Sequence, residues 1–115
     1  MKPFAAVAVA FAQALAEGRF GDAEAYLAPA LRTSLTEVEL RRNLENMLSD
    51  VDPKQPREVF ADEEFQMETW PGKQAGDVGW AYVTIQQLPR VEAVTVIVAD
   101  IESKLLIRNV EWMRP

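Results

Sequence analysis

Apolar residues follow a helical spacing in the first half of the chain and a strand-like alternation in the second half. Phe4, Phe11 and Leu15 recur on one side of a helix predicted over residues 3–17. A proline stands in its first turn and a glycine follows its end, which is the usual asymmetry of helix boundaries. We therefore expect the chain to begin with an amphipathic helix whose apolar side packs on another element.

Two further helices are expected before residue 50. A short one begins near Asp22 and is interrupted by Pro29, because proline removes a backbone donor and clashes with the preceding turn. Thr36 and Glu39 form a capping box, which predicts a third helix starting at Glu37. The helical half of the chain is therefore predicted to contain three helices.

Strands are predicted from the composition of the second half. Residues 58–70 are expected to form one bent strand or two short ones, with Phe65 and Met67 on one side. Three runs dense in β-branched and aromatic residues follow, GDVGWAYVTIQQL, RVEAVTVIVAD and ESKLLIRNVEWM. Pro89 and the polar stretch 100–104 separate them, which predicts an antiparallel meander.

The register of this meander decides which side chains face the helices. A first turn centred on Pro89 and Arg90, with a second centred on Glu102, gives one apolar face and one mixed face. The predicted helix-facing side carries Ala81, Val83, Ile85, Val94, Val96, Val98, Leu106, Arg108, Val110 and Trp112. The mixed side carries Trp80, Tyr82, Thr84, Thr95, Ile97, Leu105, Ile107, Asn109 and Glu111. A slip of one residue would exchange the two faces of the affected strand.

The order of elements predicts a single α+β domain over residues 1–115. Three N-terminal helices would pack on one face of a curved antiparallel sheet of about four strands. A chain of 115 residues has room for one core.

Composition excludes several chemistries. Cysteine and histidine are absent, so thiolate and imidazole metal sites, cysteine nucleophiles and triads with a histidine base are excluded. Asp62, Glu63 and Glu64 carry carboxylates, the ligands that hard cations prefer. Consecutive strand residues point to opposite faces, however, so we interpret the three residues as a solvated, charged strand edge. No metal or cofactor is expected. The net charge of −6 argues against nucleic acid and acidic membranes as partners.

The amino terminus imitates a secretory signal. An Ala/Val/Phe-rich run follows Lys2, and residues 12–14 resemble a cleavage site. The helical spacing of the apolar residues favours an amphipathic helix of the folded domain, and no stretch is long enough to span a bilayer. A cytoplasmic location is therefore expected.

Two segments, residues 16–23 (AEGRFGDA) and residues 107–112 (IRNVEW), carry a resemblance to a known family. A helix, a small-residue break, a buried Phe and a short second helix precede a closing three-strand meander. In this the chain resembles the nuclear transport factor 2-like superfamily, which includes ketosteroid isomerase, scytalone dehydratase and polyketide cyclases. The resemblance implies an α+β cone. Catalytic members place an aspartate-bearing strand after the second helix or a His/Asp pair in the cone, whereas residues 28–48 here form a capped helix, so no catalytic residue is carried over.

Four residues are candidates for lining a ligand pocket: Arg108, Trp112, Tyr26 and Trp70. Arg108 on an apolar face would bind a carboxylate or other anion. Alternatively, it would form a structural ion pair with a helix carboxylate such as Glu17 or Glu24, or extend its charged end to solvent at the rim of the sheet. The aromatic residues, with Trp80 and Tyr82, would line an apolar pocket or serve as core and interface. Tyr26 with Asp22, or Tyr82 with a carboxylate, is the alternative that enolate chemistry would use.

Two classes of function follow from this pattern. The first is a non-catalytic domain that binds a small apolar or anionic molecule or another protein. The alternative is a small lyase or isomerase of the ketosteroid isomerase or polyketide cyclase kind. A monomer would leave the mixed sheet face in water, so a homodimer is expected through it. The alternatives are that residues 58–70 fold back over this face or that a different protein covers it. The predicted dimer interface consists of Trp80, Tyr82, Thr84, Thr95, Ile97, Leu105 and Ile107.

Overall fold

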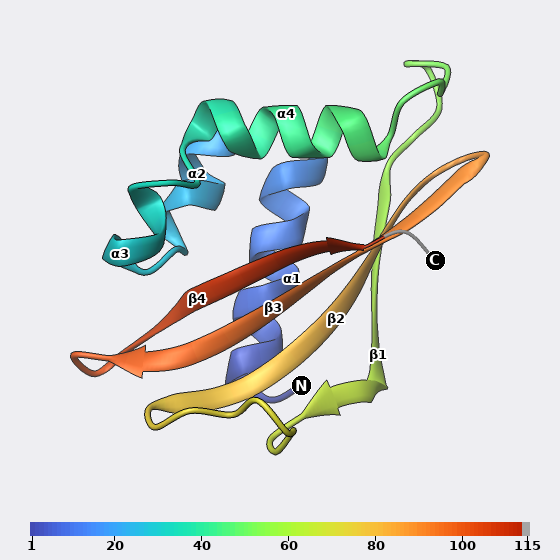
Figure 1. Cartoon of the computed structure of the whole chain (residues 1–115). Helices are drawn as coiled ribbons and strands as arrows, with labels where there is room; N and C mark the ends of the chain where they lie inside the picture. Colours follow the sequence, from blue (N-terminus) through green and yellow to red (C-terminus); the bar gives the residue numbers. More distant parts are fainter. Residues whose placement is uncertain (114–115) are drawn as a thin grey trace.

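The computed structural model describes residues 1–113, which form four helices and one antiparallel sheet of four strands (Figure 1). The strands are ordered β1-β2-β3-β4, so each pairs with its neighbour in sequence. The predicted α+β class and the meander are confirmed, with one helix more than expected. The elements are α1 (Pro3–Ala16), α2 (Phe20–Ala25), α3 (Pro29–Arg32), α4 (Glu37–Met47), β1 (Glu58–Met67), β2 (Asp77–Gln87), β3 (Arg90–Ile101) and β4 (Lys104–Met113).

Local signals explain the helix boundaries. Helix α1 ends before Gly18, whose φ of 77° is a left-handed conformation that costs glycine little. Helix α4 begins as predicted, because the Thr36 hydroxyl accepts a hydrogen bond from the Glu39 backbone N–H at 3.4 Å. The additional helix α3 has Pro29 as its first residue, so this proline starts a helical turn after interrupting the preceding one.

Helix α1 lies across one face of the sheet and contacts all four strands. Its alanines let the backbones approach closely, and the Phe4 ring occupies the space that a Cβ would fill at Gly79. Phe11 and Leu15 are fully buried against Val96 and other residues of the same core. Side chains of this core fill the space between α1 and strands β2, β3 and β4.

The first hairpin is shifted by two residues from the predicted register. Ala81 pairs with Val96 and Val83 with Val94, because the turn is made by Leu88 and Pro89. A shift of two leaves every side chain on its predicted face, since strand side chains alternate with a period of two. The helix-facing residues predicted for β2 and β3 are accordingly buried, namely Ala81, Val83, Ile85, Val94, Val96 and Val98.

The register of the second hairpin differs by one residue from the predicted register, and a difference of one residue exchanges the two faces of a strand. Glu102 and Ser103 form a two-residue turn with φ values of 52° and 68°, as a type I′ turn requires, and Ile101 pairs with Lys104. Leu105 and Ile107 therefore pack on the core side, where Ile107 is fully buried. The predicted faces of Leu105, Leu106, Ile107 and Arg108 were wrong.

An irregularity at Arg108 restores the predicted faces for the rest of β4. Val98 pairs with Ile107, but the next pair is Ile97 with Asn109, so β4 contains one residue more than β3 at this point. Val110 and Trp112 consequently pack against the core, as the alternation predicted.

The link between α2 and α3 is fixed to the edge of β4. The Ile107 N–H donates to the Tyr26 carbonyl and the Ala28 N–H donates to the Ile107 carbonyl, both at 2.8 Å. This short parallel bridge covers part of an edge that would otherwise expose unpaired backbone groups.

We expect Val96→Asp to unfold the domain, because Val96 is 1% exposed at the centre of the sheet and a carboxylate there would have no partner. Far-UV circular dichroism measures the result. Val38→Asp is the control, since Val38 on α4 is 64% exposed. A melting temperature unchanged by Val96→Asp would contradict the packing described above.

Candidate functional site

The sheet face turned away from α1, here called the outer face, carries a continuous group of large side chains. Backbone pairing places its members in rows across the strands, Phe60 beside Thr84, and Met67 beside Trp80 and Ile97. Phe60 and Phe65 are each 48% exposed, and Met67 is 38% exposed. Strand β1 therefore presents aromatic and aliphatic groups to water at the margin of the sheet.

Three aromatic rings stand close together on this face. The Phe65 and Tyr82 ring centroids are 5.4 Å apart with planes tilted by 48°, and those of Trp80 and Tyr82 are 6.3 Å apart. These tilted arrangements at 4.5–7 Å are the ones that aromatic pairs prefer. Tyr82 thus joins the exposed β1 aromatics to the central strands.

A groove of about 710 Å³ lies over β1, here called the β1 groove. It exists because the pairing of β1 with β2 is interrupted between Ala61 and Gln66. The Gln66 amide nitrogen stabilises the distortion by donating to the Asp62 and Tyr82 carbonyl oxygens, at 3.1 and 3.4 Å. The groove is lined by Phe60, Ala61, Asp62, Glu63, Glu64, Phe65, Tyr82 and Thr84.

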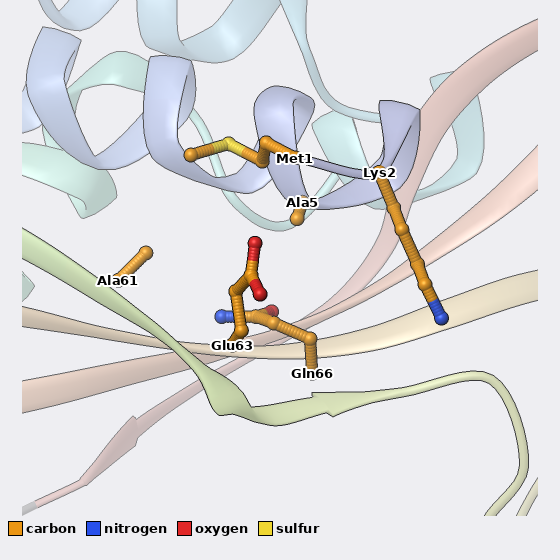
Figure 2. A pocket seen from close by; sticks show the side chains of 6 residues that line it. All are labelled: Met1, Lys2, Ala5, Ala61, Glu63 and Gln66. Atoms are coloured by element: carbon orange, nitrogen blue, oxygen red, sulfur yellow. The ribbon is translucent and has the colours of Figure 1, made fainter.

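Figure 2 shows a second hollow, of about 470 Å³, between the start of α1 and strand β1. Ala5 and Ala61 leave the space, while the Glu63 carboxylate points from β1 toward the helix. Lys2 reaches across to pair with the Glu68 carboxylate. The second hollow therefore combines the apolar Ala5 and Ala61 with the charged Lys2 and Glu63.

Arg108 forms a two-pronged ion pair with Asp77. Its Nε lies 2.7 Å from Asp77 Oδ1 and its Nη2 lies 2.8 Å from Oδ2, while the Asp77 side chain is fully buried. The hydrogen bonds from Arg108 lower the pKa of Asp77, and the backbone N–H of Gln74 contributes in the same direction. The same contact raises the pKa of Arg108. Arg108 therefore forms a structural ion pair, one of the interpretations that the sequence allowed.

The sequence suggested Glu17 or Glu24 as the partner of Arg108, and this was wrong. Glu17 pairs with Arg19 at 3.0 Å, and Glu24 accepts a hydrogen bond from the Glu37 N–H at 3.1 Å. The one-residue shift of the second hairpin turns Arg108 away from the helices, so it meets the β2 carboxylate instead.

The other pocket candidates lie on separate elements. Trp112 and Tyr26 are half-buried against the core, Tyr26 at the end of α2 and Trp112 on β4. Trp70 lies after β1, with the Lys73 ammonium 5.8 Å from the centre of its ring. None of these three residues, nor Arg108, lines either hollow.

Sequence reasoning missed the exposed aromatics of β1 as site residues. The alternation that placed Phe65 and Met67 on one side was the available signal, and Phe65 does lie on the outer face beside Tyr82. What the alternation did not show is the distortion between Ala61 and Gln66, which opens the groove beside Phe60.

Comparisons with protein-family models, with curated proteins and with solved structures found no match for this chain. Within residues 1–113, no helix has the length and apolar character needed to cross a membrane. The acidic residues of the same range form no group that could hold a metal ion. The outer face is therefore the structural feature from which we infer a function.

We expect Asp77→Asn to lower the free energy of unfolding by about 2 kcal/mol at neutral pH, because it removes a charged hydrogen-bonded pair with one buried member. Arg108→Met should cost about 3 kcal/mol, since it leaves the buried carboxylate unpaired. Chemical denaturation measures both values. Asp22→Asn, in the exposed Arg19–Asp22 pair, is the control and should change little.

The pH dependence follows from the lowered pKa of Asp77 in the folded state. Its stabilisation is complete above the ordinary value of 3.8 and is lost as the pH falls through the lower folded value. The difference between wild type and Asp77→Asn should therefore be constant above about pH 5 and shrink below about pH 4. A difference that grows on acidification would contradict this assignment.

Proposed function

We propose that this chain is a non-catalytic protein-interaction domain that forms a homodimer through the outer face of its sheet. One observation carries the proposal: the outer face exposes Phe60, Phe65 and Met67 beside half-buried Trp80 and Tyr82. From the usual area of such side chains, the first three expose roughly 200–300 Å². A patch of this size lies within the range that monomers expose, and the largest apolar patch of a small domain is often its functional surface.

The area of the sheet suits a dimer. Four strands of ten to twelve residues span roughly 600 Å² when strand spacing and rise are multiplied out. A standard interface buries about 800 Å² on each partner, so the whole outer face together with its rim is close to the required size. A twofold contact would use the same face on both copies.

Five of the seven residues predicted for the interface remain in this proposal. Trp80, Tyr82, Thr84, Thr95 and Ile97 all belong to the outer face of β2 and β3. Thr95 is only 2% exposed, so it was wrong to expect a monomer to leave its side chain in water, and it offers a partner almost no surface. Leu105 and Ile107 are withdrawn, because both pack on the core side of β4. The dimer contact is therefore centred on β2 and β3.

The filled core argues against catalysis in a cone. Phe11, Leu15 and Ile85 occupy the space between α1 and the sheet with no exposed surface. Arg108, the candidate for binding an anionic ligand, is engaged by Asp77. The lyase or isomerase alternative would need a carboxylate and a tyrosine facing each other across an enclosed cavity, whereas Tyr82 lines an open groove.

The nuclear transport factor 2-like cone remains part of the proposal as an architecture. The meander of β2 to β4 with α1 packed across it supports this, and the short helices α2 and α3 beside the β4 edge are consistent with the family pattern. A cytoplasmic location is proposed as well, supported by the packing of helix α1, in which eight of the 14 residues are buried in the core.

We expect wild-type protein to sediment as a dimer at micromolar concentration and Ile97→Arg to sediment as a folded monomer, because a guanidinium at the centre of the outer face would be buried against its own copy. Val38→Arg is the matched control, since Val38 is exposed on α4, and it should remain dimeric.

Circular dichroism of each variant checks that it is folded. A monomeric mass for the wild type, or monomers from both variants alike, would contradict self-association through this face.

A further inference from the structure

We propose that the β1 groove binds an arginine-bearing segment of a partner protein. The groove combines exposed aromatic residues with carboxylates. Phe60 and Phe65 are each 48% exposed, and Asp62 and Glu64 line the same space, whereas the Glu63 carboxylate points toward α1. Such a lining is complementary to a cation that carries its own flat or apolar surface.

The carboxylates of the groove are unneutralised. Asp62, Glu63 and Glu64 are all exposed, and within residues 1–113 none of them forms an ion pair with a lysine or an arginine. The Asp62 carboxylate accepts only a backbone hydrogen bond, from the Glu64 N–H at 3.4 Å. Asp62 and Glu64 therefore give the groove two negative charges that a partner can neutralise.

Arginine fits this lining better than lysine does. A guanidinium stacks on aromatic faces and binds carboxylates through two parallel hydrogen bonds, whereas an ammonium is a compact, strongly hydrated charge. Phe65 and Tyr82, with centroids 5.4 Å apart, provide the stacking surface beside the carboxylates. A guanidinium placed there would stack on the aromatic rings and pair with the carboxylates at the same time.

The open form of the groove favours a protein segment over a small molecule. Small-ligand sites usually enclose most of their ligand, but here the rings that would hold it are half-exposed at the margin of the sheet. A second copy of this chain is disfavoured as the occupant of the groove, because a twofold contact that placed β1 over β1 would bring four carboxylates together, Asp62 and Glu64 of each copy. The groove shares Tyr82 and Thr84 with the proposed dimer contact, so an arginine-bearing segment in the groove would compete with the second copy for these two residues.

The test is a titration of the full chain, followed by nuclear magnetic resonance, with a short blocked peptide of two arginines spaced by glycine. The matched peptide replaces both arginines with citrulline, which keeps the shape and removes the charge. We expect shifts at Phe60, Phe65 and Tyr82 with the arginine peptide and at least fivefold weaker binding of the citrulline peptide. A lysine peptide should bind about threefold more weakly than the arginine peptide.

Variants distinguish binding of the peptide in the groove from nonspecific attraction of a cationic peptide to an acidic protein. Asp62→Asn combined with Glu64→Gln should weaken binding about tenfold, and Phe65→Ala about threefold. The control is Glu45→Gln combined with Asp100→Asn, which changes the net charge equally at exposed positions outside the groove and should leave binding unchanged.

Equal binding of the arginine and citrulline peptides, or equal loss in both charge variants, would overturn the proposal. Loss of the dimer in the Asp62/Glu64 variant would also overturn it, because the occupant would then be a second copy. A wild type that is monomeric and still binds the peptide at the groove would refute the homodimer alone.

Discussion

The packing of α1 on one face of the sheet is the constraint on which the rest of the structure depends. The alanines of α1 and the glycine beneath Phe4 bring the helix close enough for Phe11 and Leu15 to fill the core. A single long helix can cover only one face of a four-stranded sheet. The opposite face, with its aromatic residues, is therefore left to solvent or to another protein, and the functional proposals follow from that one-sided burial.

Irregular pairing in the two edge strands, β1 and β4, changes which side chains face the core and which face outward. In β4, the extra residue at Arg108 keeps both Ile107 and Val110 on the core side and sends the arginine to the buried carboxylate of Asp77. In β1, the break between Ala61 and Gln66 opens the acidic groove beside exposed aromatics. Edge strands tolerate such distortions, which also make continued pairing with another sheet less favourable.

The sequence predicted the elements well because their signals are local. The Thr36 cap, Gly18 and the alternation along β2 each act within a few residues, and the structure contains all three features. Register was harder, since it depends on turn geometry. An error of two residues at Leu88 and Pro89 changed no face, whereas an error of one at Glu102 misplaced Arg108 and with it the supposed anion site.

We propose that a second copy of the chain buries the outer face. A soluble paramagnetic agent tests this directly, because it broadens the resonances of methyl groups that it can reach. We expect the Ile97 methyl groups to become protected as protein concentration rises, while those of Val38, exposed on α4, stay accessible throughout. Equal accessibility of Ile97 at low and high concentration would contradict the claim.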